Sequence, residues 1–406
     1  MKKNFLRAAL VLGLLSAIGP FAIDMYLPAL PSIGKSLGAS MSEVQASLMA
    51  FFIAMALGQV LYGPASDMLG RKRPLYFGLV LFAIGSVGCA LAPDIETLVV
   101  LRFVQGLGAC AGMVVPRAVV RDLHTGADAA RLMSLLMLVF SVSPILAPLM
   151  GSFLIEWFGW RSVFWVVTVA AGLGLWLVAT QLPETWPEKN RTSSTVRSAL
   201  AGYGVLLRDR HFMGLVLIGA FGISSFFVYL ANSSFVLINH YGLTPRQYSL
   251  AFALNAASFI GASQLTGRLG GQFGLVPLVR VSVVAYAAVM ALLWMLTLLG
   301  MGGLDVMIVL LFIGYGFLGL MLPTLTVLSL ESHGALAGTA SALMGTMQFV
   351  IGAMAMAVVG VFVDGSAQPM VGGIAACAAL AFWVARTTLL QVRPPARGRR
   401  RHHAFK

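Results

Sequence analysis

The chain has 406 residues, of which 59% are apolar and 10% are charged, and its formal net charge is +13. A soluble domain carries about a quarter charged residues to face water, so this composition excludes an ordinary soluble protein. Apolar stretches of roughly 20 residues, long enough to cross the hydrocarbon core of a membrane as helices, alternate with short polar breaks. Because lipid offers no partner to an open backbone and no alternating barrel pattern appears, we expect an all-α membrane protein.

Twelve such stretches are expected to be transmembrane helices, six in each half of the chain. In the first half they cover residues 7–29, 46–66, 75–93, 97–119, 132–155 and 163–182. In the second half they cover residues 212–238, 247–267, 276–299, 305–328, 338–362 and 370–391. The basic start of the first stretch resembles a secretory signal peptide. We reject that interpretation because the stretch continues to Leu30 without a small-residue cleavage site, and eleven further spans follow.

Basic residues are distributed very unevenly between the two sides that these spans define. With the N-terminus inside, 23 of the 27 Lys and Arg fall on the inner side, Lys35, Arg161 and Arg246 fall outside, and Arg102 lies within a span. Positive residues favour the cytoplasmic side, so both termini are expected in the cytoplasm of a bacterial inner membrane. The basic tail at 397–401 is better interpreted as a topology anchor near anionic lipid than as a nucleic-acid patch, and no nucleic-acid partner is expected.

Motifs of other protein classes are missing from the sequence. The three cysteines, Cys89, Cys110 and Cys377, fall inside predicted spans without the spacing of disulfides or metal ligands. No His-Glu-x-x-His arrangement and no Gly-x-x-x-x-Gly-Lys-(Ser/Thr) nucleotide loop is present. A membrane enzyme and an ATP-driven pump are therefore disfavoured, and we expect neither a metal nor a cofactor, with the proton gradient as the driving force.

The longest polar stretch, residues 183–211, divides the spans into two sets of six. As a cytoplasmic linker it separates an N-terminal half, residues 1–182, from a C-terminal half, residues 212–406. Residues 63–73 after the second span have a weaker copy at 263–271 after the eighth. Such internal repeats are typical of transporters in which two half-bundles enclose a cavity. A receptor or scaffold without transport leaves this repeat and the buried charges described below unexplained.

Four motifs resemble those of the major facilitator superfamily. Residues 63–73 (GPASDMLGRKR) are similar to its loop Gly-x-x-x-Asp-(Arg/Lys)-x-Gly-(Arg/Lys)-(Arg/Lys). Residues 101–108 (LRFVQGLG) are similar to its fourth-helix motif, and residues 147–152 (APLMGS) to its antiporter motif Gly-Pro-x-x-Gly-Gly. Residues 24–31 (DMYLPALP) are similar to the bicyclomycin-resistance and chloramphenicol-efflux (Bcr/CflA) branch of drug:proton antiporters.

The chain departs from these motifs at three positions. Met68 stands where the loop usually has a basic residue, and Ala147 and Ser152 replace glycines of the antiporter motif. The resemblance implies two pseudo-symmetric six-helix halves that export small amphiphilic compounds, such as chloramphenicol-like or bicyclomycin-like antibiotics, in exchange for protons by alternating access. The alternatives are proton symport and proton-coupled transport of an endogenous nucleoside, sugar or amino-acid derivative by the same fold.

The resemblance also implies roles for particular residues. Arg102 is expected to act in proton coupling and substrate access. A charged set at the cytoplasmic end is expected to latch the two halves in the outward-facing state, or else only to set topology. It consists of Asp67, Arg71 and Asp122. The antiporter motif contributes Pro144, Pro148 and Gly151, and the two prolines are expected to bend their helix, which suits rocking but is also compatible with a static kink.

Two charged residues lie at membrane depth. Asp24 is the only acid clearly inside the predicted membrane region, and Arg102 is the one basic residue well inside a span. A charge at the bilayer centre costs at least ~2.5 kcal/mol, so such residues usually face a cavity or a partner. Their similar depth allows them to share a cavity. We expect Asp24 to bind and release the coupling proton; the alternatives are a helix-end cap for Asp24 and a structural charge bound by carbonyls for Arg102.

Candidate substrate contacts are polar and aromatic side chains at membrane depth, because a few polar groups in an apolar pocket orient a ligand. They are Tyr26, Gln105, Phe226, Tyr229, Asn232, Phe235, Asn255, Tyr315 and Gln348. The expected partners are therefore a small-molecule substrate, protons and membrane lipid. We expect the monomer to be the functional unit.

Overall fold

The computed structural model describes residues 2–123, 126–186, 188, 196–331 and 336–389, and the basic tail at 397–401 lies outside them. These residues form helices and no strand, which confirms the all-α class. The first half contains α1 (Lys2–Asp24), the 3₁₀ turn η1 (Leu27–Ala29), α2 (Leu30–Leu37), α3 (Met41–Leu69), α4 (Lys72–Leu91), α5 (Ile95–Leu123), α6 (Gly126–Phe158) and α7 (Arg161–Thr180). The linker and second half contain α8 (Val196–Arg208), α9 (Arg210–Ser234), the π-helix η3 (Phe235–His240), α10 (Pro245–Phe273), α11 (Leu275–Leu298), α12 (Leu304–Glu331), α13 (Ala337–Val361) and α14 (Gln368–Thr388).

Eleven helical spans in the described ranges are long and apolar enough to cross a membrane. The one remaining predicted span, residues 247–267, corresponds to α10, whose 29 residues exceed the roughly 20 that a membrane requires. It is less apolar because it carries polar side chains such as Asn255 and Gln264, and it packs against α12 and α6. Exposed side chains such as Leu61 and Phe77 make the outside of the bundle apolar, as a surface in contact with lipid must be.

The first span is interrupted, which the sequence analysis did not anticipate. Pro28 has no N–H for the carbonyl of Asp24 four residues earlier, so α1 ends at Asp24. The chain continues through η1 and α2, and this span therefore reaches Leu37 instead of ending near residue 29. By contrast, α6 remains one continuous helix through Pro144 and Pro148.

The second helices of the two halves begin and end in the same way. Both α3 and α10 have 29 residues and start with a capping box, formed by Ser40 with Glu43 in α3 and by Thr244 with Gln247 in α10. Each is followed by a glycine with positive φ, Gly70 at 88° and Gly274 at 87°. A residue with a side chain is strained there, so these glycines allow the sharp turns into α4 and α11. The internal repeat is thus visible in the helix termini as well as in the sequence.

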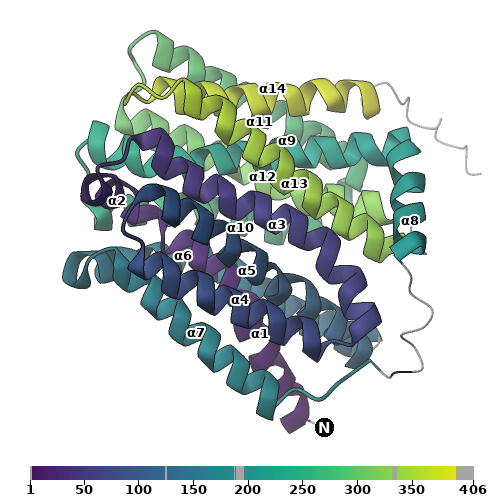
Figure 1. Cartoon of the computed structure of the whole chain (residues 1–406). Helices are drawn as coiled ribbons and strands as arrows, with labels where there is room; N and C mark the ends of the chain where they lie inside the picture. Colours follow the sequence, from purple (N-terminus) through teal and green to yellow (C-terminus); the bar gives the residue numbers. More distant parts are fainter. Residues whose placement is uncertain (1, 124–125, 187, 189–195, 332–335, 390–406) are drawn as a thin grey trace, which may run out of the picture.

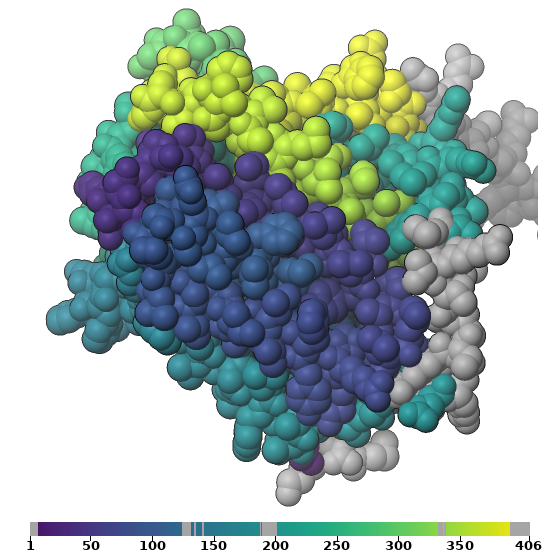
Figure 2. Space-filling model, in the orientation of Figure 1, coloured from purple at the N-terminus to yellow at the C-terminus, as the bar shows by residue number. Residues whose placement is uncertain are grey.

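The two halves meet along two helix pairs, α3 with α13 and α6 with α10. Figure 2 shows α13 lying directly against α3 on one face of the molecule. The linker, which was predicted without a helix, contains α8. This helix packs against α13 and α9. In Figure 1, α8, the N-terminus and the end of α14 all lie at the same end of the bundle.

Candidate functional site

Asp24 lies at the break that ends α1, and its side chain is 6% exposed. Its hydrogen-bond partner is Ser143 of α6, whose Oγ donates to Asp24 Oδ2 at 3.2 Å. The approach of α6 depends on Gly151, because a Cβ atom there would lie 2.3 Å from the carbonyl oxygen of Met25. The antiporter-motif glycine therefore packs α6 against the backbone next to the buried carboxyl group.

Arg102 of α5 is completely buried. Its Nη1 donates to Gln105 Oε1 at 2.5 Å and to the carbonyl of Ala22 at 3.3 Å. The guanidinium lies between the rings of Tyr26 and Phe51, at 4.3 Å from each centroid, an arrangement that stabilises a cation through the ring quadrupoles. Its Nε and Nη2 have no hydrogen-bond partner. The site thus holds a cation with two free donors.

Asp24 and Arg102 are not joined by an ion pair in the part of the chain that the structure describes. Arg102 bonds the backbone carbonyl of Ala22, whereas the side chain of Asp24 bonds Ser143 of α6. Asp24 therefore faces α6 while Arg102 faces α1 from α5. That the two share a cavity stays a prediction.

The charged set of Asp67, Arg71 and Asp122 is brought together as expected. Arg71, 3% exposed, bonds Asp122 through Nε at 2.7 Å and Nη2 at 3.2 Å, and bonds Asp67 through Nη1 at 2.5 Å. Burial lowers the pKa of the Arg71 guanidinium, but hydrogen bonds to Asp122 and Asp67 more than offset this and raise it above its ordinary value. These bonds all lie within the first half, so the latch between halves stays a prediction.

The linker completes this charged set, which sequence analysis missed. Thr185 Oγ1 donates to Asp122 Oδ2 at 3.0 Å, and Trp186 Nε1 donates to the carbonyl of Asp67 at 2.9 Å. The Trp186 ring also covers the Arg71 guanidinium at 4.6 Å. The only sequence signal was a tryptophan within a polar segment, which is unusual for a solvated linker.

Four of the substrate candidates come together in the second half. An aromatic cluster from α9, α10 and α12 consists of Phe226, Tyr229, Phe252, Phe259 and Tyr315. Ring centroids within it are 5.5 to 6.3 Å apart, the range of favourable offset and edge contacts. Asn255 joins the cluster through its Nδ2, which donates to the Tyr229 hydroxyl at 3.0 Å.

The other substrate candidates lie elsewhere. Asn232 is bonded across the two halves, since Gln45 Nε2 of α3 donates to its Oδ1 at 2.9 Å. Tyr26 bonds Ser47 at 2.6 Å, and Gln105 donates to Ser86 at 2.8 Å, so both belong to the Arg102 surroundings. Phe235 is buried in η3, and Gln348 is half-buried on α13.

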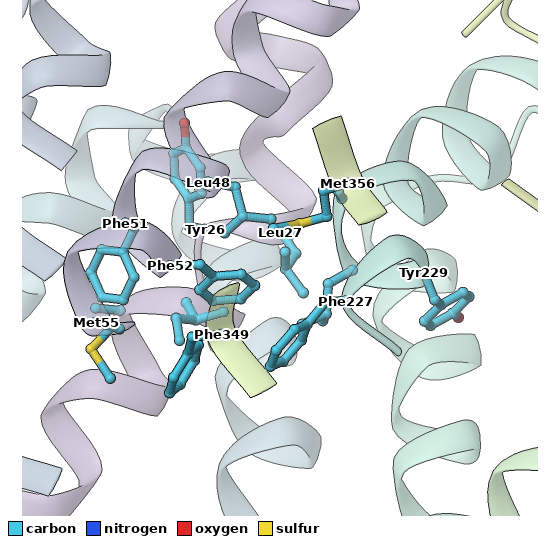
Figure 3. Close-up of a cluster of buried hydrophobic side chains, with 14 of the residues drawn as sticks. Tyr26, Leu27, Leu48, Phe51, Phe52, Met55, Phe227, Tyr229, Phe349 and Met356 are labelled. Carbon is cyan, nitrogen blue, oxygen red and sulfur yellow. The ribbon is translucent and has the colours of Figure 1, made fainter. Parts of the chain in front are cut away.

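Three rings join the halves between these sites. Phe52 of α3 lies 4.6 Å from Phe227 of α9 and 5.6 Å from Phe349 of α13, and Phe227 stacks on Phe349 at 5.6 Å. Figure 3 shows the three rings gathered together, with Tyr229 further into the second half. Gly352 makes room for them, because a Cβ atom there would lie 2.1 Å from Phe227 Cδ2. The sequence gives no sign that these phenylalanines meet.

Contacts at the end of the bundle opposite the charged set also connect the halves. Besides the Gln45–Asn232 bond, Ser249 Oγ of α10 donates to the carbonyl of Pro148 in α6 at 2.9 Å. The turn η1 packs against both α9 and α10, and α2 packs against η3. The broken first span therefore covers the buried sites from the end opposite the charged set.

A two-fold repeated bundle of membrane helices with buried charges inside one half defines a membrane transporter. A family model described as Major Facilitator Superfamily matches residues 12–357, so the chain belongs to that superfamily, in its bicyclomycin-resistance and chloramphenicol-efflux branch. The uncharacterised transporter YdgK of Bacillus subtilis is 38% identical over 361 residues, which cover 88% of this chain and 90% of that protein.

Two further comparisons agree with this family. A bicyclomycin resistance protein homolog of Haemophilus influenzae is 30% identical over 369 residues, which cover 91% of this chain and 92% of that protein. The solved structure of a D-xylose–proton symporter superposes with a TM-score of 0.72 at 18% identity, covering 93% of this chain and 96% of the other. At that identity the structural likeness supports the fold alone. The chain is therefore a multi-pass membrane transporter and not an enzyme.

Proposed function

We propose that the protein exports small amphiphilic compounds, such as chloramphenicol-like or bicyclomycin-like antibiotics, across the bacterial inner membrane in exchange for protons. The observation that carries this proposal is Asp24, a buried carboxyl group at membrane depth with a serine hydroxyl as its hydrogen-bond partner. Ionisable groups placed in this way mark proton pathways in transporters. The drug-resistance names of relatives support the export of toxic compounds.

Alternating access requires Asp24 to meet different surroundings in two states. In this structure it bonds Ser143, next to the tight contact between Gly151 and Met25. Movement of α6 relative to α1 changes this contact, and with it the ease of proton exchange. Arg102, with two free donors close to the same break, supplies a positive charge that the carboxylate reaches in another state. The cytoplasmic set around Arg71 serves as the latch that slows or releases this movement.

The remaining parts of the proposal concern the orientation in the membrane, the functional unit, the partners and the source of energy. Both termini face the cytoplasm, in accord with the distribution of Lys and Arg. The monomer is the functional unit, the partners are substrate, protons and lipid, and the proton gradient replaces any cofactor or nucleotide.

Inverted membrane vesicles with an acidic lumen test this proposal. Addition of chloramphenicol to the wild type is expected to release protons from the lumen, because the compound moves inward as protons move out. The Asp24→Asn variant is expected to release none, whereas Asp305→Asn, at an exposed position at the start of α12, is expected to behave as the wild type. Proton uptake in place of release would indicate symport, and equal release by the Asp24→Asn variant would exclude Asp24 from the coupling.

A further inference from the structure

The aromatic cluster contains two polar atoms without partners. Tyr315 Oη and Asn255 Oδ1 have no hydrogen-bond partner, although their residues are 0% and 1% exposed. Rotating the Asn255 amide by half a turn only exchanges its two ends, so one end lacks a partner in either orientation. A buried polar group without a partner costs free energy, so two in one cluster require an explanation.

The cluster is closed at its centre and partly open at one edge. Phe226 and Phe259 are partly exposed, whereas Tyr229, Phe252 and Tyr315 are buried. Phe226 is also the chain neighbour of Phe227, which contacts Phe52 of the other half. A movement of the halves that separates Phe52 from Phe227 therefore alters access to the cluster at the same time.

The chemistry of the cluster selects an uncharged ligand. None of the described Asp, Glu, Lys or Arg residues acts electrostatically on Tyr229 or Tyr315, whose neighbours are hydroxyl, amide and thiol groups. Asp24 acts on Tyr248, whose ring contacts Phe252 at the edge of the cluster with a centroid distance of 6.1 Å, but it does not act on Tyr229 or Tyr315. A charged ligand placed here would lose its hydration without gaining a counter-charge.

We propose that the aromatic cluster and Asn255 form a subsite for the uncharged aromatic part of the exported compound. An N–H or O–H of the compound donates to Asn255 Oδ1, while the Tyr315 hydroxyl bonds a second polar atom beside it. The surrounding rings stack against the compound's own ring. This inference rests on the proposed function as an exporter, and it names the chemical class: an aromatic amide or alcohol without a formal charge.

The test uses the purified full-length protein and two probes in equilibrium dialysis. Chloramphenicol is uncharged and aromatic and carries an amide N–H and hydroxyl groups, whereas ethidium is an aromatic cation. The variants are Tyr315→Phe and Asn255→Leu, which remove the polar atoms while keeping most of the volume. Tyr241→Phe is the matched control, because this partly buried tyrosine of the same half has its hydroxyl bonded to the carbonyl of Gly302 and does not act on Tyr229 or Tyr315.

Each of the two variants is expected to raise the dissociation constant of chloramphenicol roughly 3- to 10-fold, the worth of one neutral hydrogen bond. The Tyr241→Phe control is expected to stay within a factor of about 2 of the wild type, since its hydroxyl lies outside the subsite. Ethidium is expected to bind more weakly than chloramphenicol and to be insensitive to both variants.

A second measurement separates a ligand site from ordinary packing. Without ligand, Tyr315→Phe is expected to raise the melting temperature by roughly 1–3 °C, because it removes an unsatisfied buried hydroxyl. Tyr241→Phe, which removes a bonded hydroxyl, is expected to lower the melting temperature or leave it unchanged. More stability with weaker binding is the signature of a polar group retained for function.

Several results would overturn the inference: wild-type chloramphenicol binding by both variants, no binding by folded wild-type protein, or ethidium binding that depends equally on Asn255 and Tyr315. Binding that depends on these residues supports the subsite, even if vesicles show no compound-driven proton movement. That combination would contradict only the proposed proton coupling and would leave the subsite supported.

Discussion

The N-terminus of α4 is capped by a residue more than a hundred positions away. Its own N-cap residue, Arg71, makes no side-chain cap bond. Instead, the carboxylate of Glu184 accepts the backbone N–H of Arg71 at 2.8 Å and that of Lys72 at 3.1 Å. These donors have no partner within the helix, and a negative charge also interacts favourably with the helix dipole. The linker thus supplies the cap and fixes the loop that carries Arg71.

Replacing this carboxylate should therefore destabilise the first half. Loss of a cap costs about 0.5–2 kcal/mol, and loss of an exposed charge at a helix N-terminus costs about 0.3–1 kcal/mol. We expect Glu184→Ala to lower the free energy of unfolding by about 1–2 kcal/mol in total. For a six-helix half of this size, this corresponds to a fall in melting temperature of about 3–6 °C. The control is Glu156→Ala, which replaces an exposed acid at the C-terminal end of α6.

Thermal unfolding in detergent and hydrogen exchange measure this effect. The amides of Arg71 and Lys72 should exchange faster in Glu184→Ala, while those in the middle of α4 keep their protection, because only the end of the helix loses its partners. A melting temperature equal to that of Glu156→Ala, together with unchanged exchange at both amides, would refute the capping argument.

The remaining predictions concern the transport cycle. Asp67→Asn should lower the transport rate several-fold with little change in substrate affinity, as measured by initial rates over a range of substrate concentrations; a change confined to affinity would count against a latch. Gly151→Ala should abolish transport in a protein that still reaches the membrane, because its Cβ would lie 2.3 Å from a backbone oxygen, whereas Gly172→Ala, with nothing within 4 Å, should transport normally. Arg102→Lys should lose compound-driven proton release, since an ammonium group cannot stack between two rings as a guanidinium does; wild-type release would show that charge alone suffices.

The helices and their order could be predicted because each span must by itself be long and apolar enough to cross the membrane. Hydrophobic length, turn residues and basic loops are local properties, and they gave the twelve-span, all-α architecture. A helix end at Asp24 beside Pro28 was left open as an alternative, but the span was placed at 7–29 because the apolar run continues past Asp24. Helix α8 was missed because its segment is short and polar at its start.

Site residues were predictable where a charge stands out against an apolar background. Asp24 and Arg102 were found in this way, whereas the set around Arg71 was found through its resemblance to a family motif, and the structure places each at a buried position or within a hydrogen-bonded group. Their partners were not predictable. Ser143 and Glu184 are ordinary polar residues whose importance comes from packing between distant segments, which one sequence does not reveal.

Aromatic residues gave the weakest signal because phenylalanine is common throughout membrane helices. The sequence suggested Phe226 and Tyr315 but not Phe252, which the structure places beside Tyr229. Neighbouring residues also separate: Phe226 belongs to the aromatic cluster and Phe227 to the contact between halves. Only the rotation of α9 about its axis decides which residue faces which surroundings.

The most direct test of proton coupling compares two transport modes of the Asp24→Asn variant in proteoliposomes. Exchange of labelled for unlabelled chloramphenicol, without any gradient, needs substrate binding and movement of the halves but no proton. Accumulation of chloramphenicol driven by a pH gradient needs substrate binding, movement of the halves and a transported proton. We expect the variant to keep exchange at a rate close to that of the wild type and to lose accumulation. Accumulation at the wild-type level would contradict the assignment of Asp24 as the proton carrier.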